Sequence, residues 1–74
     1  MSCRIDFTWD DEASVWIATS KDVPGLILES GSFDALIERV RYAVPELLEL
    51  NNKQTEIVDL TFVSESHDQL AVYG

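Results

Sequence analysis

The sequence predicts an α+β fold, a two-layer sandwich of order β-β-β-α-β(-β) in which one amphipathic helix covers a mostly antiparallel sheet. Three observations lead to this prediction. Apolar residues recur at a helical interval only between Ser32 and Leu50. The segments on both sides alternate apolar and polar residues, as half-buried strands do. Short turn-forming segments separate the first three strands, which favours antiparallel pairing between them.

The helix is predicted from one apolar stripe that must pack on a sheet to be stable. Ser32 is a suitable N-cap, because its hydroxyl can accept a hydrogen bond from a free N–H of the first turn. Pro45 lacks one helical N–H, yet the stripe keeps its phase beyond it, which favours a kinked continuous helix over a restart. Asn51 and Asn52 can end the helix in the left-handed conformation. The stripe contains Phe33, Leu36, Ile37, Val40, Val44, Leu47 and Leu48.

The first three strands are expected at residues 3–9, 15–20 and 26–30. Residues 10–14 carry three adjacent acidic side chains and form a solvated hairpin loop between the first two strands. In the next turn Pro24 fixes φ, and Gly25 can adopt the positive φ of a type II turn.

The fourth strand is expected at residues 56–63, with Val58, Leu60 and Phe62 facing the helix. If it lies beside the first strand and parallel to it, the sheet order is 3-2-1-4. Residues 70–73 form either a short fifth strand or a frayed terminus. Open sheet edges favour a homo-oligomer, a dimer or a tetramer. The candidate residues for that interface are Leu70, Val72 and Tyr73.

Length and composition narrow the functional classes. The 74 residues suit one small domain, with no room for a separate DNA-binding domain. One cysteine and one histidine exclude an intramolecular disulfide and give no metal-ligand spacing, so no cofactor is expected and a cytoplasmic location fits. No apolar run is long enough to span a membrane. The net charge of −9 opposes direct nucleic-acid binding and favours a basic protein partner, although it can also serve solubility alone.

Several residues are candidates for chemistry, each with a structural alternative. Asp6 and Asp59 should face the same side of adjacent strands, as paired metal-binding carboxylates do, but a solvated or salt-bridged pair is the commoner arrangement. His67 lies in a polar turn and is interpreted as a surface residue rather than a general base. Cys3 should be buried and inert. No catalytic residue is therefore assigned, and the chain is interpreted as not an enzyme.

The two tryptophans flank the acidic loop, where aromatic side chains often anchor a protein partner while charges steer the encounter. Trp9 continues the apolar face of its strand and is assigned to the core. Trp16 alternates with Val15 and Ile17, and the sequence leaves open which of these two sets faces away from the helix. The candidate partner-binding residues are Asp10, Asp11, Glu12 and Trp16.

Residues 15–29, followed by Ser32, Phe33, Asp34 and Leu36, resemble the amino-terminal domain of HicB-type antitoxins, especially the short single-domain form. The most specific part is the turn Asp22-Val23-Pro24-Gly25-Leu26 between two strands and before a capped helix. The resemblance spans most of residues 1–74 and implies a partial ribonuclease H-like fold.

The resemblance also implies a function. Domains of this family bind and block a small basic RNA-cleaving toxin of the HicA type, while a separate carboxy-terminal segment binds operator DNA. The chain is therefore expected to be an antitoxin-like protein-binding module without direct DNA binding. Two alternatives stand beside this expectation: a small metal-dependent RNA hydrolase acting through Asp6 and Asp59, and an orphan oligomeric interaction domain with no toxin.

Overall fold

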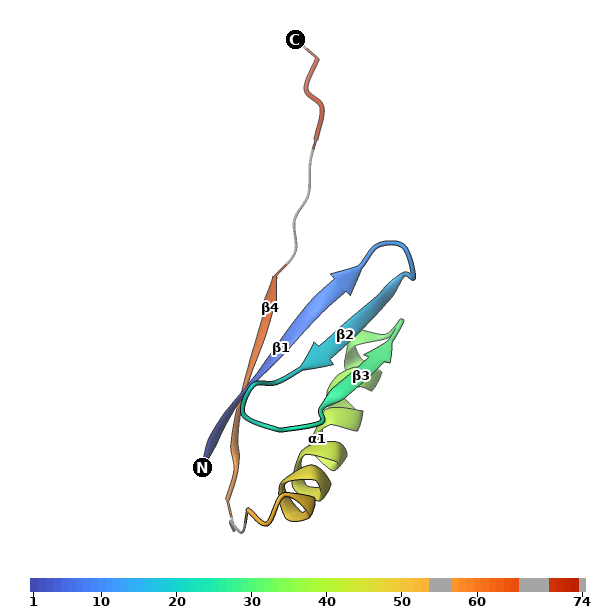
Figure 1. The fold of residues 1–74 in the computed structure, drawn as a ribbon. Helices are drawn as coiled ribbons and strands as arrows, with labels where there is room; N and C mark the ends of the chain where they lie inside the picture. Colours follow the sequence, from blue (N-terminus) through green and yellow to red (C-terminus); the bar gives the residue numbers. More distant parts are fainter. Residues whose placement is uncertain (54–56, 66–69, 74) are drawn as a thin grey trace.

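The fold is a two-layer α+β sandwich in which one helix lies on one face of a four-stranded sheet (Figure 1). This computed structural model describes residues 1–53, 57–65 and 70–73. The predicted order of elements is confirmed. The elements are β1 Ser2–Asp10, β2 Val15–Thr19, β3 Ile27–Ser30, α1 Phe33–Leu50 and β4 Asp59–Glu65.

The sheet has the predicted order β3-β2-β1-β4, with β1 central and parallel to β4. The other two pairings, β1 with β2 and β2 with β3, are antiparallel. The fourth strand was expected at residues 56–63 but runs from Asp59 to Glu65, and Glu56 lies outside the described residues. The reason is register: β4 pairs with β1 from Ser2↔Asp59 to Thr8↔Glu65, so the start of β1 at Ser2 sets where β4 begins.

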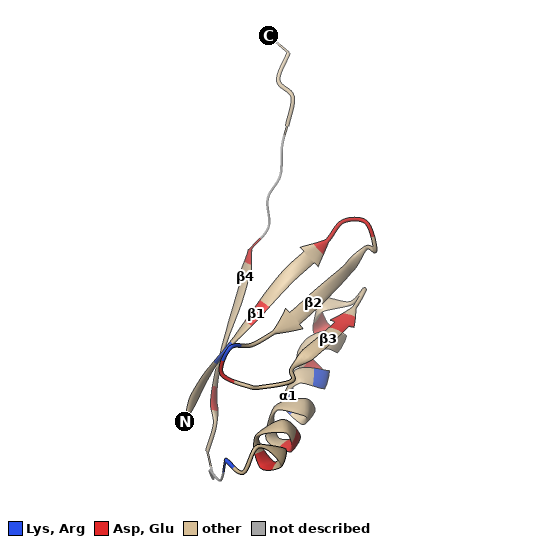
Figure 2. Cartoon of the chain, viewed as in Figure 1, with Lys and Arg blue, Asp and Glu red and all other residues tan. Residues whose placement is uncertain are grey.

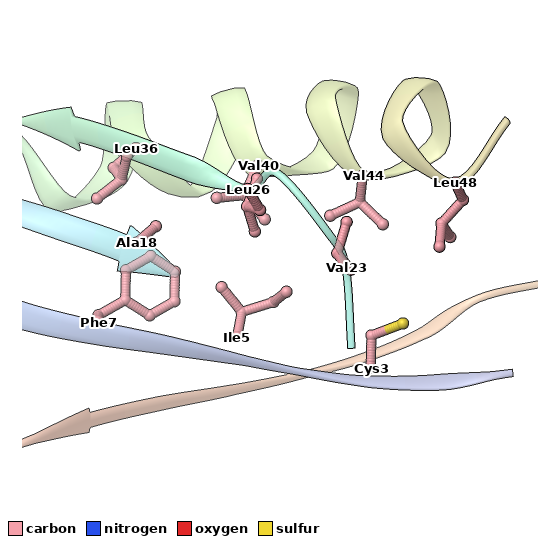
Figure 3. Close-up of a cluster of buried hydrophobic side chains, with 10 residues drawn as sticks. All are labelled: Cys3, Ile5, Phe7, Ala18, Val23, Leu26, Leu36, Val40, Val44 and Leu48. Carbon is pink, nitrogen blue, oxygen red and sulfur yellow. The ribbon is translucent and has the colours of Figure 1, made fainter. Parts of the chain in front are cut away.

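The core lies between α1 and the sheet (Figure 3). β1 contributes three buried side chains, β2 contributes Ala18, and the connection from β2 to β3 contributes two more. Every residue of the predicted helical stripe is either buried or packed against this core, so the predicted packing face is confirmed. The buried side chains are Cys3, Ile5, Phe7, Ala18, Val23, Leu26, Leu36, Val40, Val44 and Leu48.

The ends of α1 follow the sequence signals. The Ser32 hydroxyl accepts a hydrogen bond from the backbone N–H of Ala35 at 3.2 Å, as an N-cap does. The helix is continuous through Pro45, whose side chain is exposed. Asn52 takes the left-handed conformation with φ 58° just beyond the helix. No helix of the described residues is long and apolar enough to cross a membrane.

The connection from β2 to β3 completes the hydrogen bonding of β1. β2 ends at Thr19, which pairs with Asp6, so the beginning of β1 has no strand beside it on that edge. The Asp22 carboxylate accepts the backbone N–H of Arg4 at 2.8 Å, and the Ser20 hydroxyl donates to the Arg4 carbonyl at 2.7 Å. The Ser20 oxygen also accepts from the backbone N–H of Asp22 and of Val23. Side chains therefore replace a neighbouring strand at this edge.

The same connection inserts two apolar side chains beneath α1. Val23 is 0 % exposed and Leu26 is 3 % exposed. Between them Gly25 has φ +86°, and the Leu26 N–H donates to the Val23 carbonyl at 3.2 Å, which together make the predicted type II turn. The third strand was expected to begin at Leu26, but it begins one residue later because Leu26 closes this turn.

Residues 70–73 form no strand, so the optional fifth strand is not present among the described residues. They lie away from the sheet (Figure 1). Leu70, Val72 and Tyr73 are 79 %, 89 % and 93 % exposed, so this chain alone does not bury them. Their role in an oligomer interface stays a prediction.

The first testable prediction concerns Asp22. We expect Asp22→Ala to lower the free energy of unfolding by about 1 kcal/mol, because the Arg4 N–H loses its acceptor and the loop loses an anchor. In a domain of this size that corresponds to a fall of about 4–8 °C in Tm. Lys21→Ala, at the neighbouring exposed position, is the control and should change stability by less than about 0.5 kcal/mol. Equal effects in thermal or urea unfolding would contradict the role of the hydrogen bond.

The second prediction concerns Cys3, which is 1 % exposed. Burial, and then the negative charge of Asp22, raise the pKa of its thiol, so the reactive thiolate is scarce at neutral and mildly basic pH. We expect a thiol reagent at pH 8 to label the native protein at least about 100-fold more slowly than the urea-unfolded chain, because labelling requires opening of the core. As the chain has one cysteine, the signal is unambiguous. Equal rates would show that Cys3 is accessible.

Candidate protein-binding site

Five aromatic rings form a continuous row on the helix side of the sheet. The row begins on β4 with Phe62, whose ring centroid lies 5.6 Å from that of Phe7 on β1. Phe7 contacts Phe33 at 4.9 Å, and Phe33, the first residue of α1, contacts Trp16 on β2 at 5.0 Å. Trp16 contacts Trp9 at 5.4 Å in an edge-to-face arrangement. This aromatic row, made of Phe62, Phe7, Phe33, Trp16 and Trp9, reaches the hairpin loop between β1 and β2.

The two ends of the aromatic row are open to solvent. Trp9 is 42 % exposed and Phe62 is 36 % exposed, whereas Phe7 in the middle is 2 % exposed. The assignment of Trp9 to the core is therefore wrong in part: its ring shares a face with Ile5 and Phe7, but it is not covered. The reason is that α1 begins at Phe33 and lies against β2 and β3. The helix therefore does not cover the end of β1, where Trp9 lies.

The ring of Trp16 packs against the ring of Trp9. The two residues are direct partners in the β1–β2 register, and Trp16 is half-buried against the core. Trp16 therefore belongs to the helix side of the sheet, while Val15 and Ile17 face the opposite, uncovered side. The sequence pattern left open which of these two sets faces away from the helix, and the structure shows that it is Val15 and Ile17. Trp9 is therefore the more accessible indole of the pair, although only Trp16 was predicted as a partner-binding residue.

The acidic loop stands next to Trp9 and is ordered by its own side chains. The Asp10 carboxylate accepts the backbone N–H groups of Glu12 and Ala13 at 3.0 and 3.2 Å. The Trp9 indole N–H donates to the Asp11 carboxylate at 3.4 Å. Asp10 thus orders the loop, the Asp11 carboxylate lies beside the indole, and Glu12 is an exposed charge in the same loop. Figure 2 shows the acidic tip of this hairpin.

An exposed indole ring beside a carboxylate, in an acidic loop, is suited to a lysine or arginine side chain. The carboxylates attract the cation, and the ring face accepts it through a cation–π contact. The arginines of this chain do not fill that role: Arg4 pairs with Asp6 at 2.8 Å, Arg41 pairs with Glu38 at 3.1 Å, and Arg39 donates to the Glu29 carbonyl at 2.9 Å. The site therefore fits a basic surface of another molecule.

The two carboxylates proposed for metal binding do not come together. Asp6 and Asp59 lie on the same face of adjacent strands, as the alternation predicted, but Asp6 is level with Val63 and Asp59 is level with Ser2. Four residues along a strand separate them by about 13 Å, too far to share one metal ion. Within residues 1–53, 57–65 and 70–73, no three His, Cys, Asp or Glu side chains are grouped to hold a metal. His67 lies outside these residues.

Asp6 belongs instead to a polar cleft of about 350 Å³ at the other end of β1. Arg4, Asp6, Lys21 and Asp22 line it. Both acidic groups are engaged, since the Asp6 carboxylate bonds to the Arg4 side chain and the Asp22 carboxylate bonds to the Arg4 backbone. Two positive and two negative groups nearly balance, so the cleft offers neither a strong anion site nor a strong cation site.

Comparison with known proteins identifies the family. Among curated proteins, none matches the sequence significantly. A crystal structure of hypothetical protein TTHA1013 from the extremely thermophilic bacterium Thermus thermophilus is similar, with 35 % identity, a TM-score of 0.82, and coverage of 95 % of this chain and 100 % of that chain. Residues 2–74 match the family described as Domain of unknown function (DUF1902). The chain therefore belongs to the DUF1902 family.

Proposed function

We propose that this protein is an antitoxin-like binding module that neutralises a small basic RNA-cleaving toxin of the HicA type. The observation that carries the proposal is the exposed indole of Trp9 beside the carboxylate of Asp11, in a loop that also carries the exposed Glu12. Such a surface recognises lysine or arginine side chains, and a net charge of −9 adds long-range attraction for a basic protein. Blocking the basic RNA-binding surface of a nuclease would prevent substrate binding.

The identity of the toxin rests on the resemblance to HicB-type antitoxins. The resembling segment contains the turn from Asp22 to Leu26, and in this chain that turn anchors β1 and fills the core. Its residues therefore support a common fold, while the contact surface lies elsewhere, at the β1–β2 hairpin. This division explains how one fold can keep its internal turn and vary its partner surface.

The hydrolase alternative receives less support than the antitoxin, whereas the orphan alternative is separated from it only by whether a toxin exists. An RNA hydrolase would need carboxylates close enough to share a metal, but Asp6 and Asp59 are four residues apart in register and Asp6 is paired with Arg4. An orphan interaction domain has the same surfaces and differs only in lacking a toxin. A neighbouring reading frame that encodes a small basic protein would favour the antitoxin, and co-expression of the two should restore the growth that the basic protein alone arrests.

The third testable prediction concerns steering by the acidic loop. We expect the pair Asp11→Asn and Glu12→Gln to slow association with the basic partner on the order of 10-fold at low salt and to flatten its salt dependence, because exposed charges act mainly on the association rate. These replacements keep side-chain shape, and Asp10 is left unchanged because it holds the loop. Stopped-flow or surface plasmon resonance measurements at several salt concentrations provide the test.

The matched control is Glu46→Gln with Glu49→Gln, which makes the same change in net charge on the exposed face at the far end of α1. This control should alter the association rate much less than the loop variant does. If both pairs slow association equally, the net charge rather than the loop steers the partner, and the site assignment fails.

The fourth prediction concerns the aromatic anchor. We expect Trp9→Ala to speed dissociation of the partner about 10-fold with little effect on association, because an indole buried at an interface contributes mainly to residence time. Trp16→Ala should also speed dissociation, since Trp16 supports Trp9, but it should lower stability as well because Trp16 packs against the core. Tyr42→Ala, which removes an aromatic ring that is 74 % exposed on α1, is the control and should leave dissociation unchanged.

Two results would contradict the proposed function. Magnesium-dependent RNA cleavage by the purified protein, abolished by Asp6→Asn, would identify a hydrolase. Tight binding to RNA or duplex DNA at physiological salt would likewise contradict a surface specialised for a basic protein.

A further inference from the structure

The two edges of the sheet differ sharply. At one edge β3 has four residues, and the Arg39 guanidinium bonds to the Glu29 carbonyl at 2.9 Å, so a side chain blocks this edge. At the other edge β4 has seven residues, Asp59–Glu65, and no described residue of this chain lies along its outer side. Of the two edges, β4 is the one that can accept another strand.

The backbone groups of β4 that face outward can be assigned. Asp59 donates its N–H to the Met1 carbonyl at 2.8 Å, so Asp59 directs its polar backbone groups toward β1. These groups alternate in direction along a strand, so those of Leu60, Phe62 and Ser64 point away from β1. Leu60 and Phe62 are level with Cys3 and Ile5, so their side chains lie on the helix side of the sheet. Leu60 is half-buried, and Phe62 is 36 % exposed.

We propose that β4 pairs antiparallel with β4 of a second copy of this chain, with the two-fold axis at Thr61, to form one continuous eight-stranded sheet. In this register Leu60 of each copy lies opposite Phe62 of the other, and these two residues exchange both backbone hydrogen bonds. Their apolar side chains meet on the helix side and extend both aromatic rows across the interface. The inference does not rest on the proposed toxin binding.

Charge favours this register over the register with the axis at Phe62. Both registers satisfy the outward backbone groups, since each pairs even-numbered residues with even-numbered residues. With the axis at Phe62, Asp59 of each copy would lie opposite Glu65 of the other, and like charges directly opposite are destabilising. With the axis at Thr61, Asp59 lies opposite Val63 and Glu65 lies opposite Ile57. Of these two registers, the one with the axis at Thr61 keeps the acidic side chains of the two copies apart.

The fifth testable prediction is a site-specific cross-link. In the proposed register the two copies of residue 61 form a non-hydrogen-bonded pair with Cα atoms about 4.5 Å apart, within the range of a disulfide. We expect the full-length Thr61→Cys protein to become mostly covalent dimer on mild oxidation. Phe62→Cys, Asp59→Cys and Val63→Cys should each stay uncrosslinked, whereas a mixture of the last two should form a heterodimer. The native Cys3 is buried and gives no background.

Equilibrium measurements give a second, independent test. We expect the wild-type protein to sediment as a dimer at about 10 µM and to dissociate at least 10-fold more readily as Thr61→Glu, because two carboxylates then face each other at the axis. Tyr42→Glu makes the same charge change on the outer face of α1 and should leave the dimer intact. Higher salt should strengthen the dimer, since each copy carries −9, whereas it should weaken binding of a basic partner. The two proposals can therefore fail separately.

Three outcomes would overturn this assignment. The first is a wild-type monomer at 10 µM in high salt. The second is a cross-link through Phe62→Cys in place of Thr61→Cys, which would place the axis elsewhere. The third is a dimer that survives Thr61→Glu and is dissociated by Val72→Asp, which would move the interface to residues 70–73.

Discussion

The fold depends on how the first half of β1 is held on the edge that β2 does not reach. β2 stops at Thr19, and beyond it the Ser20 hydroxyl donates to the Arg4 carbonyl while the Asp22 carboxylate accepts the Arg4 N–H. The same short segment then places Val23 and Leu26 beneath α1. One loop thus satisfies the polar edge of the central strand and fills the apolar layer above it. The position of β3, and through it that of α1, follows from this loop.

Local patterns predicted the parts of the fold that local physics determines. The helical stripe, the Ser32 cap and the positive φ at Gly25 each depend on neighbouring residues, and each was predicted correctly. The strand ends depend on a partner that is distant in the sequence. β4 is shifted relative to the prediction because β1 sets its register, and β3 starts late because Leu26 closes a turn. Alternation identifies a strand, but it contains no information about register.

Because the alternation of apolar and polar residues contains no information about register or about which strands the helix covers, the sequence also led to errors at the candidate site. Alternation correctly placed Asp6 and Asp59 on one face, yet only the register shows that they lie at different levels. Trp9 shares the face of Ile5 and Phe7, yet its exposure depends on where α1 begins and which strands it covers. Asp10 could have been recognised in the sequence as a loop-stabilising residue, because aspartate at the start of a turn often accepts the backbone N–H groups that follow.

The two proposed surfaces are compatible because they lie on different parts of the sheet. In the proposed two-fold dimer, Thr61 would lie on the axis; within one chain Thr61 is level with Arg4, and Trp9 lies five residues further along β1. Each Trp9 is therefore about 17 Å from the axis along the strand direction, and the two copies point in opposite directions, roughly 33 Å apart. In the proposed dimer, the two proposed partner sites are therefore well separated. The distance also separates the two acidic loops by several Debye lengths at physiological salt, so in the proposed dimer the two loops repel each other only weakly.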